Sequence, residues 1–290
     1  MKKIILVLLA VTAILFSCSK TKDKDIDNPN KGEITVETDE SFKSVIEALA
    51  ERYMALNPLT KINVVIKKED LGFLDLLNKK ARVVVMSREL TNQEKAAFDT
   101  KVELPWQPAK FAADAVLFVV PKNSPVESVS MYEIYKELTS DSKNLIFDGT
   151  NSSNLNFVAQ KFNKKPADLK FSIINGNENV VSQLKNYPGK IGVISYNTIS
   201  RPFGEEAQRL RTELKILKVI KNGKVYEPSL DNLKTMNYPF TRVLYLLTNE
   251  TYYGLGNGFI RFSCQQLGQI VVEKEGLQPY NIFKREVQMR

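Results

Sequence analysis

The sequence predicts an α/β fold built around a parallel sheet, and three observations lead to this prediction. Apolar strand candidates alternate with helical patterns from residue 33 onward. The strand candidate Ala81–Met86 contains a continuous run of valine, as in parallel strands that are buried on both faces. A polar turn follows each of the first three strands. Because strand–helix–strand units cross over in a right-handed sense, they place helices on both faces of one sheet.

The first elements have the clearest patterns. A strand through Ile34 and Val36 leads into a helix whose apolar positions, from Phe42 to Met54, recur at i, i+3, i+4 and i+7. This helix must end before Pro58. The next expected elements are a strand over 62–66, a helix through Leu71, Leu74 and Leu77, the strand over 81–86 and a helix after Thr91.

The patterns beyond residue 105 are more varied. Residues 200–236 are polar and show few patterns apart from one strand and the turn Asn222-Gly223. The expected elements are two strands within 106–121, a helix over 132–138, a strand over 145–147, a helix over 155–162, a helix near 180–184, strands over 188–196 and 214–220, a strand from 238 and a final helix over 259–274.

The composition indicates a globular chain without the residues that most hydrolases and zinc sites require. At 290 residues, with 43% hydrophobic and 26% charged residues, the chain is long enough for two compact domains. It has no histidine, and after Cys18 only Cys264 remains, which we expect to be a buried, inert thiol. Histidine-dependent catalysis, the usual zinc sites and an internal disulfide are therefore excluded. We expect a protein that is not an enzyme and has no cofactor or metal.

The formal net charge is +8, with lysine and arginine scattered among acidic residues. This modest excess suits an anionic ligand or surface. Nucleic-acid binding is not expected, because the basic residues do not gather in one stripe.

Residues 1–17 predict a lipoprotein signal peptide. Two lysines precede an apolar run over residues 4–16, which is too short to span a bilayer. The sequence Leu-Phe-Ser-Cys at its end resembles the lipobox of bacterial lipoproteins, in which the cysteine is lipidated. We therefore expect a lipid anchor on Cys18, a location in the cell envelope on the periplasmic or cell-surface side, and a flexible tether over residues 18–32.

Several polar turns are placed where a ligand could bind. Ligands of parallel α/β sheets bind outside the carboxyl ends of the strands, where the turns 38–42, 67–70 and 87–91 lie. A fourth turn, residues 147–155, places small polar residues before a helix. Helix N-termini carry unpaired N–H groups and partial positive charge, so they suit an anion. Ordinary helix capping explains the hydroxyls of Ser41 and Ser152 equally well, and both interpretations stay open.

Three segments carry a resemblance to a known family. Residues 238–245 (Tyr-Pro-Phe-Thr-Arg-Val-Leu-Tyr), residues 188–196 (Pro-Gly-Lys-Ile-Gly-Val-Ile-Ser-Tyr) and residues 258–280 follow one another in the family's order. They resemble the phosphate-binding (PstS-like) proteins of bacterial ABC importers, and the resemblance covers about residues 33–290. It implies a two-lobed type II periplasmic-binding fold, each lobe a mainly parallel sheet flanked by helices. Lobe I would comprise residues 33–113 and 240–290, and lobe II residues 114–239.

The resemblance also implies a ligand site. In that family, hydroxyl and backbone N–H groups from several turns surround a dehydrated phosphate. The corresponding ligand-binding residues here would be Thr38, Ser41, Phe42, Ser87, Arg88, Asn151, Ser152, Ser153 and Asn154.

The chain departs from the family in its charges. Arg88 stands where the family has a carboxylate, Asp148 lies near the place of the family's arginine, and Lys67-Lys68-Glu69-Asp70 replaces a Gly/Ser-rich turn. For Arg88, a ligand role and a surface ion pair with Glu89 or Glu69 both stay open. We expect Lys67 and Lys68 to be solvated.

Two functions from different classes follow. The first is a lipid-anchored, monomeric solute-binding protein that captures inorganic phosphate or another small oxyanion for an ABC transporter permease. The alternative is a lipoprotein that uses the same fold for interaction, sensing or assembly, with a different ligand or none.

Overall fold

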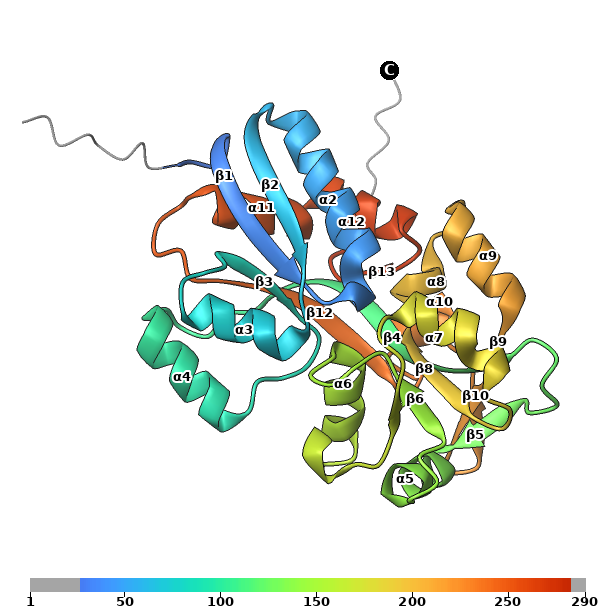
Figure 1. Ribbon diagram of the computed structural model, residues 1–290. Helices are drawn as coiled ribbons and strands as arrows, with labels where there is room; N and C mark the ends of the chain where they lie inside the picture. The colour runs from blue at the N-terminus through green and yellow to red at the C-terminus, as the bar shows by residue number, and fades with distance from the viewer. Residues whose placement is uncertain (1–26, 283–290) are drawn as a thin grey trace, which may run out of the picture.

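The computed structural model describes residues 27–282, which form a mixed α/β fold with one long curled sheet and helices on its faces (Figure 1). The predicted signal peptide, Cys18 and most of the predicted tether lie outside the described residues. Within residues 27–282, no helix has both the length and the apolar character needed to cross a membrane.

The main sheet has the strand order β2-β1-β3-β12-β4-β8-β6-β7, and β13 and β9 also pair with β4. A smaller sheet has the order β11-β10-β5. The strands are β1 Lys31–Thr38, β2 Leu59–Ile66, β3 Val83–Met86, β4 Ala109–Pro121, β5 Ser128–Ser130, β6 Leu145–Phe147, β7 Ser172–Ile173, β8 Ile191–Ser195, β9 Leu214–Ile216, β10 Lys218–Lys221, β11 Lys224–Tyr226, β12 Thr241–Thr248 and β13 Gln278–Pro279.

Helices follow most of these strands, as expected for alternating strand and helix patterns. The α-helices are α2 Lys43–Leu56, α3 Glu69–Leu77, α4 Asn92–Val102, α5 Met131–Thr139, α6 Ser153–Lys161, α7 Asn177–Gln183, α8 Asn197–Ser200, α9 Glu205–Glu213, α10 Leu230–Lys234, α11 Leu255–Cys264 and α12 Gln266–Lys274. A 3-10 turn, η1 (Glu40–Phe42), joins β1 to α2, and the short 3-10 turns η2 (Pro166–Asp168) and η3 (Leu184–Asn186) follow α6 and α7.

The parallel pairing expected from the sequence lies in the outer strands of the sheet. β1 pairs in parallel with β2 and β3, and β6 pairs in parallel with β7 and β8. The strands β12 and β4 lie between these groups and pair antiparallel with each other and with their outer neighbours, β3 and β8. The sheet is therefore mixed, because the chain passes from one group to the other along β4 and returns along β12.

β4 is a single strand of 13 residues, where the sequence predicted two. Its first part, from Ala109 to Ala115, pairs with β12, and the part from Val116 to Val119 pairs with β8. Every residue from Phe111 to Val120 is buried and the run contains no glycine or proline, so no backbone breaker divides the strand.

Three groups of core residues define the two lobes. One group comprises buried residues from Ala115 to Phe240, and we call the elements around it lobe II. The other two groups comprise buried residues up to Ala112 and from Leu244 onward, and we call the elements around them lobe I. The core therefore changes along β4 and β12. The exact boundaries after residues 113 and 239 stay a prediction.

Other differences from the expected elements concern weakly patterned segments. β1 begins at Lys31, inside the predicted tether. Helix α9 was not predicted, because only Ala207 and Leu210 of its nine residues are buried. The strand expected over 214–220 is divided into β9 and β10, which join different sheets.

The expected final helix is two helices, α11 and α12, which meet at the extended residue Gln265. Cys264 ends α11 and is half-buried rather than buried, and burial raises the pKa of its thiol to about 11, so it is protonated at neutral pH. At the start of α12, a Cβ on Gly268 would lie 2.2 Å from the carbonyl oxygen of Phe262. The bend therefore requires glycine at this position.

Gly268→Ala should lower the free energy of unfolding by about 1–3 kcal/mol, the cost of forcing atoms into a packed region. This loss should occur although alanine is the better helix former by about 0.8–1 kcal/mol. Urea unfolding monitored by circular dichroism measures the change. Gly72→Ala is the matched control on α3, because a Cβ there would meet its nearest atom at 3.6 Å. Equal stability of the two variants would contradict the steric account.

Candidate ligand-binding site

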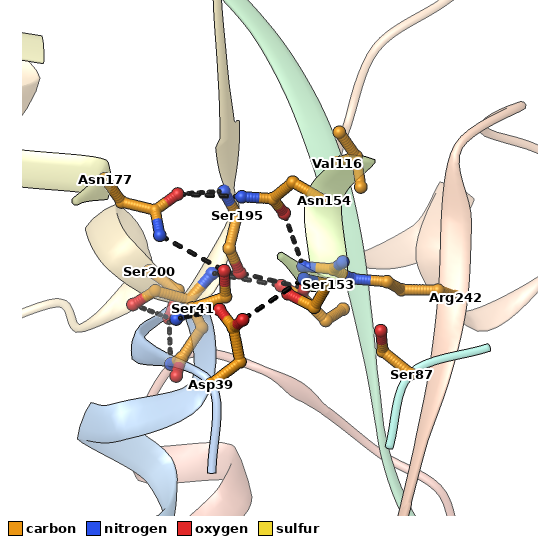
Figure 2. Close-up of polar contacts among 12 residues, drawn as sticks. Asp39, Ser41, Ser87, Val116, Ser153, Asn154, Asn177, Ser195, Ser200 and Arg242 are labelled. Carbon is orange, nitrogen blue, oxygen red and sulfur yellow. Dashed lines mark hydrogen bonds and ion pairs between the residues drawn. The ribbon is translucent and has the colours of Figure 1, made fainter. Parts of the chain in front are cut away.

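A cluster of polar side chains is buried between the two lobes. Buried polar groups cost free energy unless they are paired, so the helices and strands that carry them are held in contact by the hydrogen bonds within the cluster. Each of the following residues is at most 2% exposed: Thr38, Asp39, Ser41, Ser87, Asp114, Asp148, Ser152, Ser153, Asn154, Asn177, Ser195, Asn197 and Arg242. Figure 2 shows that Asp39 and Arg242, from two other segments, point toward Ser153 and Asn154 at the start of α6.

The ion pair between Arg242 and Asp114 lies at the centre of the cluster. The two residues are opposite each other on β12 and β4, and both side chains are fully buried. Nε and Nη2 of Arg242 each lie 2.8 Å from Oδ2 of Asp114. Asp114 also accepts hydrogen bonds from Ser195 Oγ at 2.9 Å and from the backbone N–H of Asn197 at 3.0 Å. This network fixes the guanidinium in one orientation.

The guanidinium of Arg242 faces lobe II with part of its donor capacity unused. The Phe42 ring lies 4.6 Å from its central carbon, a cation–π contact. Nη2 donates to Oδ1 of Asn154 at 2.9 Å. Nη1 is buried and has no hydrogen-bond partner within residues 27–282.

The start of helix α6 supplies the backbone donors of the site. The turn before it requires positive φ at Gly149 (+143°) and Asn151 (+57°), which glycine and asparagine tolerate. Ser152 caps the helix: its Oγ accepts from the N–H of Leu155 at 3.4 Å and donates to the carbonyl of Gly149 at 3.1 Å. The Oγ of Ser153 is buried and has no partner among the described residues. Ser152 therefore acts as a cap, whereas the Ser153 hydroxyl is available.

Both carboxylate oxygens of Asp39 accept backbone hydrogen bonds, one from each lobe. Oδ1 accepts from the N–H of Ser41 at 3.0 Å, within its own turn. Oδ2 accepts from the N–H of Ser153 at 3.1 Å, on helix α6 of lobe II. Beside it, Ser41 Oγ accepts from Nδ2 of Asn177 at 3.1 Å, a second direct contact between the lobes.

Asp148 is paired with Lys68, which corrects the expectation that Lys68 is solvated. The Lys68 ammonium lies 3.1 Å from Oδ2 of Asp148 and 2.9 Å from its carbonyl oxygen, and the lysine side chain is 25% exposed. Burial, and then the negative charge of Asp39, raise the pKa of Asp148. A fully buried carboxylate needs a nearby cation, and the turn that replaces the family's Gly/Ser-rich segment supplies one. Lys67 is paired as well, with Asp75 and Glu37.

Arg88 is surrounded by carboxylates. Its Nη1 and Nη2 make a bidentate contact with the carboxylate of Glu94 (2.9 and 2.7 Å). Nη2 also lies 2.8 Å from Oδ1 of Asp70, and Nε lies 3.4 Å from Oε2 of Glu69. The expected pair with Glu69 is present, but Arg88 is only 8% exposed, so this is a buried network rather than a surface pair. Ser87 donates to the same Glu69 through both N–H and Oγ, at 2.7 Å each. In this structure both residues are therefore engaged within lobe I.

The structure thus brings together part of the predicted site. Ser41, Phe42, Ser153 and Asn154 contact Asp39, Asn177 or Arg242, and Thr38 lies next to Asp39 and donates to its carbonyl. Asn151 is exposed and serves the turn, and Ser152 serves as the cap. Whether any of these residues binds a ligand stays a prediction.

Sequence reasoning missed four central residues. These are Asp39, Asp114, Asn177 and Arg242. Two of them carried a usable signal, because Asp114 and Arg242 each interrupt an otherwise apolar strand, and a buried charge needs an opposite partner. Asp39 and Asn177 carried none, because asparagine and aspartate are ordinary residues of turns.

The centre of the cluster is closed to the surface in this structure. A cavity of about 460 Å³ reaches Ser41, Asn177 and Asn197, and another of about 670 Å³ reaches Arg88 and Asn156. Neither is lined by Asp39, Ser153 or Arg242. Within the described part of the chain, no group of three or more acidic or cysteine residues could hold a metal ion. The site therefore offers hydrogen-bond donors and charges that direct contacts between the lobes now enclose.

Asp114→Ala should lower the free energy of unfolding by about 3–5 kcal/mol, because it leaves the Arg242 guanidinium buried without its counter-charge. Chemical denaturation measures the loss. The exposed Asp99 on α4 is the matched control, and Asp99→Ala should change stability by no more than about 0.5 kcal/mol. A loss below about 1 kcal/mol for Asp114→Ala would show that the pair does not stabilise the fold.

Comparisons with known proteins agree with this architecture. The family model described as a PBP superfamily domain matches residues 23–266 of the 290. The phosphate-binding protein PstS of Borreliella burgdorferi is 23% identical over 296 residues, covering 95% of this chain and 97% of that protein.

Two solved structures share the fold. One, from Clostridium perfringens, is provisionally assigned as a phosphate ABC transporter substrate-binding protein and contains bound phosphate. It superposes with a TM-score of 0.70 at 20% identity and covers 86% of this chain and 100% of that one. An ABC-type phosphate transport receptor from Vibrio cholerae gives 0.64 at 18% identity, with 86% and 100% coverage.

Proposed function

The chain belongs to the PBP superfamily and is PstS-like in sequence and fold, and on this premise we propose that it captures phosphate or a related oxyanion between its lobes for an ABC importer. One observation carries the proposal. Two buried donors, Nη1 of Arg242 and Oγ of Ser153, have no partner in the described chain and lie at the start of α6 between the lobes.

The chemistry of these donors suits an oxyanion. An arginine offers planar, permanently charged N–H donors, and the first turn of a helix adds backbone N–H groups and partial positive charge. A tetrahedral oxyanion has enough oxygens to accept from the guanidinium, the hydroxyl and the backbone at once. In this proposal Arg242, rather than Arg88, is the main charged donor, because Arg88 already binds three carboxylates.

The proposal places the protein at the cell envelope. The relatives are named as phosphate-binding and phosphate transport proteins, and the N-terminal sequence resembles a lipobox that ends at Cys18. The protein would be held to the membrane by its lipid, deliver its ligand to a permease as a monomer, and carry out no catalysis.

The alternative, an interaction or sensory lipoprotein of the same fold, draws support from the carboxylates in the site. Asp39 and Asp148 are fully buried beside the donors, and negative charge there opposes an anionic ligand. Titration of the protein with phosphate and sulfate separates the two functions.

Ser153→Ala should weaken phosphate binding by about 0.5–1.5 kcal/mol, because it removes one neutral donor. It should leave stability unchanged, since the hydroxyl has no partner in the protein. Ser152→Ala is the matched control: it removes the cap of α6 and should cost about 1 kcal/mol of stability with little effect on affinity. Isothermal titration of residues 27–290 with phosphate and with sulfate, together with thermal unfolding, measures both effects.

Two results of the titration would count against the proposal. If the parent binds neither oxyanion at millimolar concentration, the importer function fails and the interaction function takes its place. If the parent binds phosphate and Ser153→Ala binds it equally well, the ligand does not sit at the start of α6.

Cys18→Ser should abolish lipidation, because the thiol is the site of acylation. The variant should be soluble or held only by its uncleaved signal, and the folded body should be unaffected. Incorporation of labelled fatty acid in growing cells, followed by fractionation, measures this. Labelling of the Cys18→Ser protein equal to that of the parent would exclude Cys18 as the anchor.

A further inference from the structure

We propose that the Asp39 carboxylate occupies the oxyanion position, so that it closes the lobes in the absence of ligand and competes with any anion for the site. The inference rests on the proposed function, because the position it concerns is that of the proposed ligand. It assigns to Asp39 the control of affinity at that site.

The geometry of Asp39 exceeds what a helix cap requires. The bond from Oδ1 to the Ser41 N–H is an ordinary cap of η1. The bond from Oδ2 to the Ser153 N–H crosses 114 residues of sequence, to the first residue of α6 in the other lobe. A carboxylate that accepts backbone N–H groups from both lobes makes the contacts that a bound anion would make.

Two buried donors that Asp39 leaves unpaired indicate that the position suits an anion with more oxygens than a carboxylate has. A carboxylate has two oxygens, and both are occupied by Ser41 and Ser153 backbone groups. Arg242 Nη1 and Ser153 Oγ then remain without partners, although both are buried. An oxyanion with four oxygens could accept from these two donors as well as from the backbone, so it could replace Asp39 with more hydrogen bonds than the carboxylate makes.

The charge balance makes displacement necessary. Three buried carboxylates, Asp39, Asp114 and Asp148, lie beside two cations, the buried Arg242 and the partly exposed Lys68. Adding an anion beside Asp39 would place two negative charges in a buried region, where their repulsion is stronger than in water. Binding therefore requires Asp39 to leave. The apparent association constant is then the intrinsic constant multiplied by the fraction of molecules in which Asp39 has left.

Asp39→Ser tests the inference, because serine can still cap η1 but is too short to reach Ser153. Small-angle X-ray scattering of the ligand-free protein, residues 27–290, should give a larger radius of gyration for the variant than for the parent. Titration with inorganic phosphate should show binding about tenfold tighter or more. Asp141→Asn, which changes a carboxylate that is 92% exposed, is the control for net charge and should match the parent in both measurements.

A second variant covers the case in which Asp39→Ser does not fold. Asp39→Asn keeps the size of the side chain and removes its charge, and it should change both measurements in the same direction by a smaller amount. Thermal unfolding confirms that each variant is folded before it is compared.

The outcomes separate the inference from the proposed function. An unchanged radius of gyration in a folded Asp39 variant, or expansion with phosphate binding no tighter than the parent's, overturns the inference and leaves phosphate binding by the parent intact. Expansion of Asp39→Ser when neither protein binds phosphate supports closure by Asp39 and overturns the oxyanion function. Expansion with tighter phosphate binding supports both.

Discussion

The buried ion pair between Arg242 and Asp114 is the interaction on which the rest of the structure depends. It joins β12 to β4, the two strands along which the chain passes between the lobes. An isolated charge in this position would be very costly, so each residue requires the other, and Ser195 and Asn197 complete the network. The pair also positions the guanidinium against Asn154 at the start of α6. The same contact that stabilises the centre of the fold thus sets the geometry of the candidate site.

The sequence predicted much of the fold because its strong patterns are local. The helix from Phe42 to Met54 was predicted from its apolar periodicity and the strand before Ser87 from its continuous run of valine, and both are present in the structure. The break between α11 and α12 was missed because it depends on one backbone contact at Gly268, which no pattern reveals. The length of β4 was missed because an apolar run does not show which two partners it will pair with.

The site was predicted only in part, for a related reason. Turns that follow strands could be found from residue types, and four of the predicted residues do meet between the lobes. Which hydroxyl caps a helix and which stays unused depends on φ and ψ of a turn, so Ser152 and Ser153 could not be distinguished. The carboxylate partners of Arg88 are Glu69, Asp70 and Glu94. Of these, only Glu69 was named from the sequence. The pairing of Lys68 with Asp148 links two turns of different lobes and needed the folded structure.

The continuity of β4 has a mechanical consequence for how the lobes can separate. β4 and β12 form a hydrogen-bonded ribbon that runs through the junction without a flexible linker. Such a ribbon bends across its plane more easily than its strands slide past each other, because sliding would break the ladder of hydrogen bonds. Arg242 and Asp114 are opposite each other in that ladder, so they would stay together while the ribbon flexes, whereas Asp39 and Ser153 lie on separate bodies and would part. Opening would then be a bending of the β4–β12 ribbon, in which the Arg242–Asp114 pair stays intact and the Asp39–Ser153 hydrogen bond breaks.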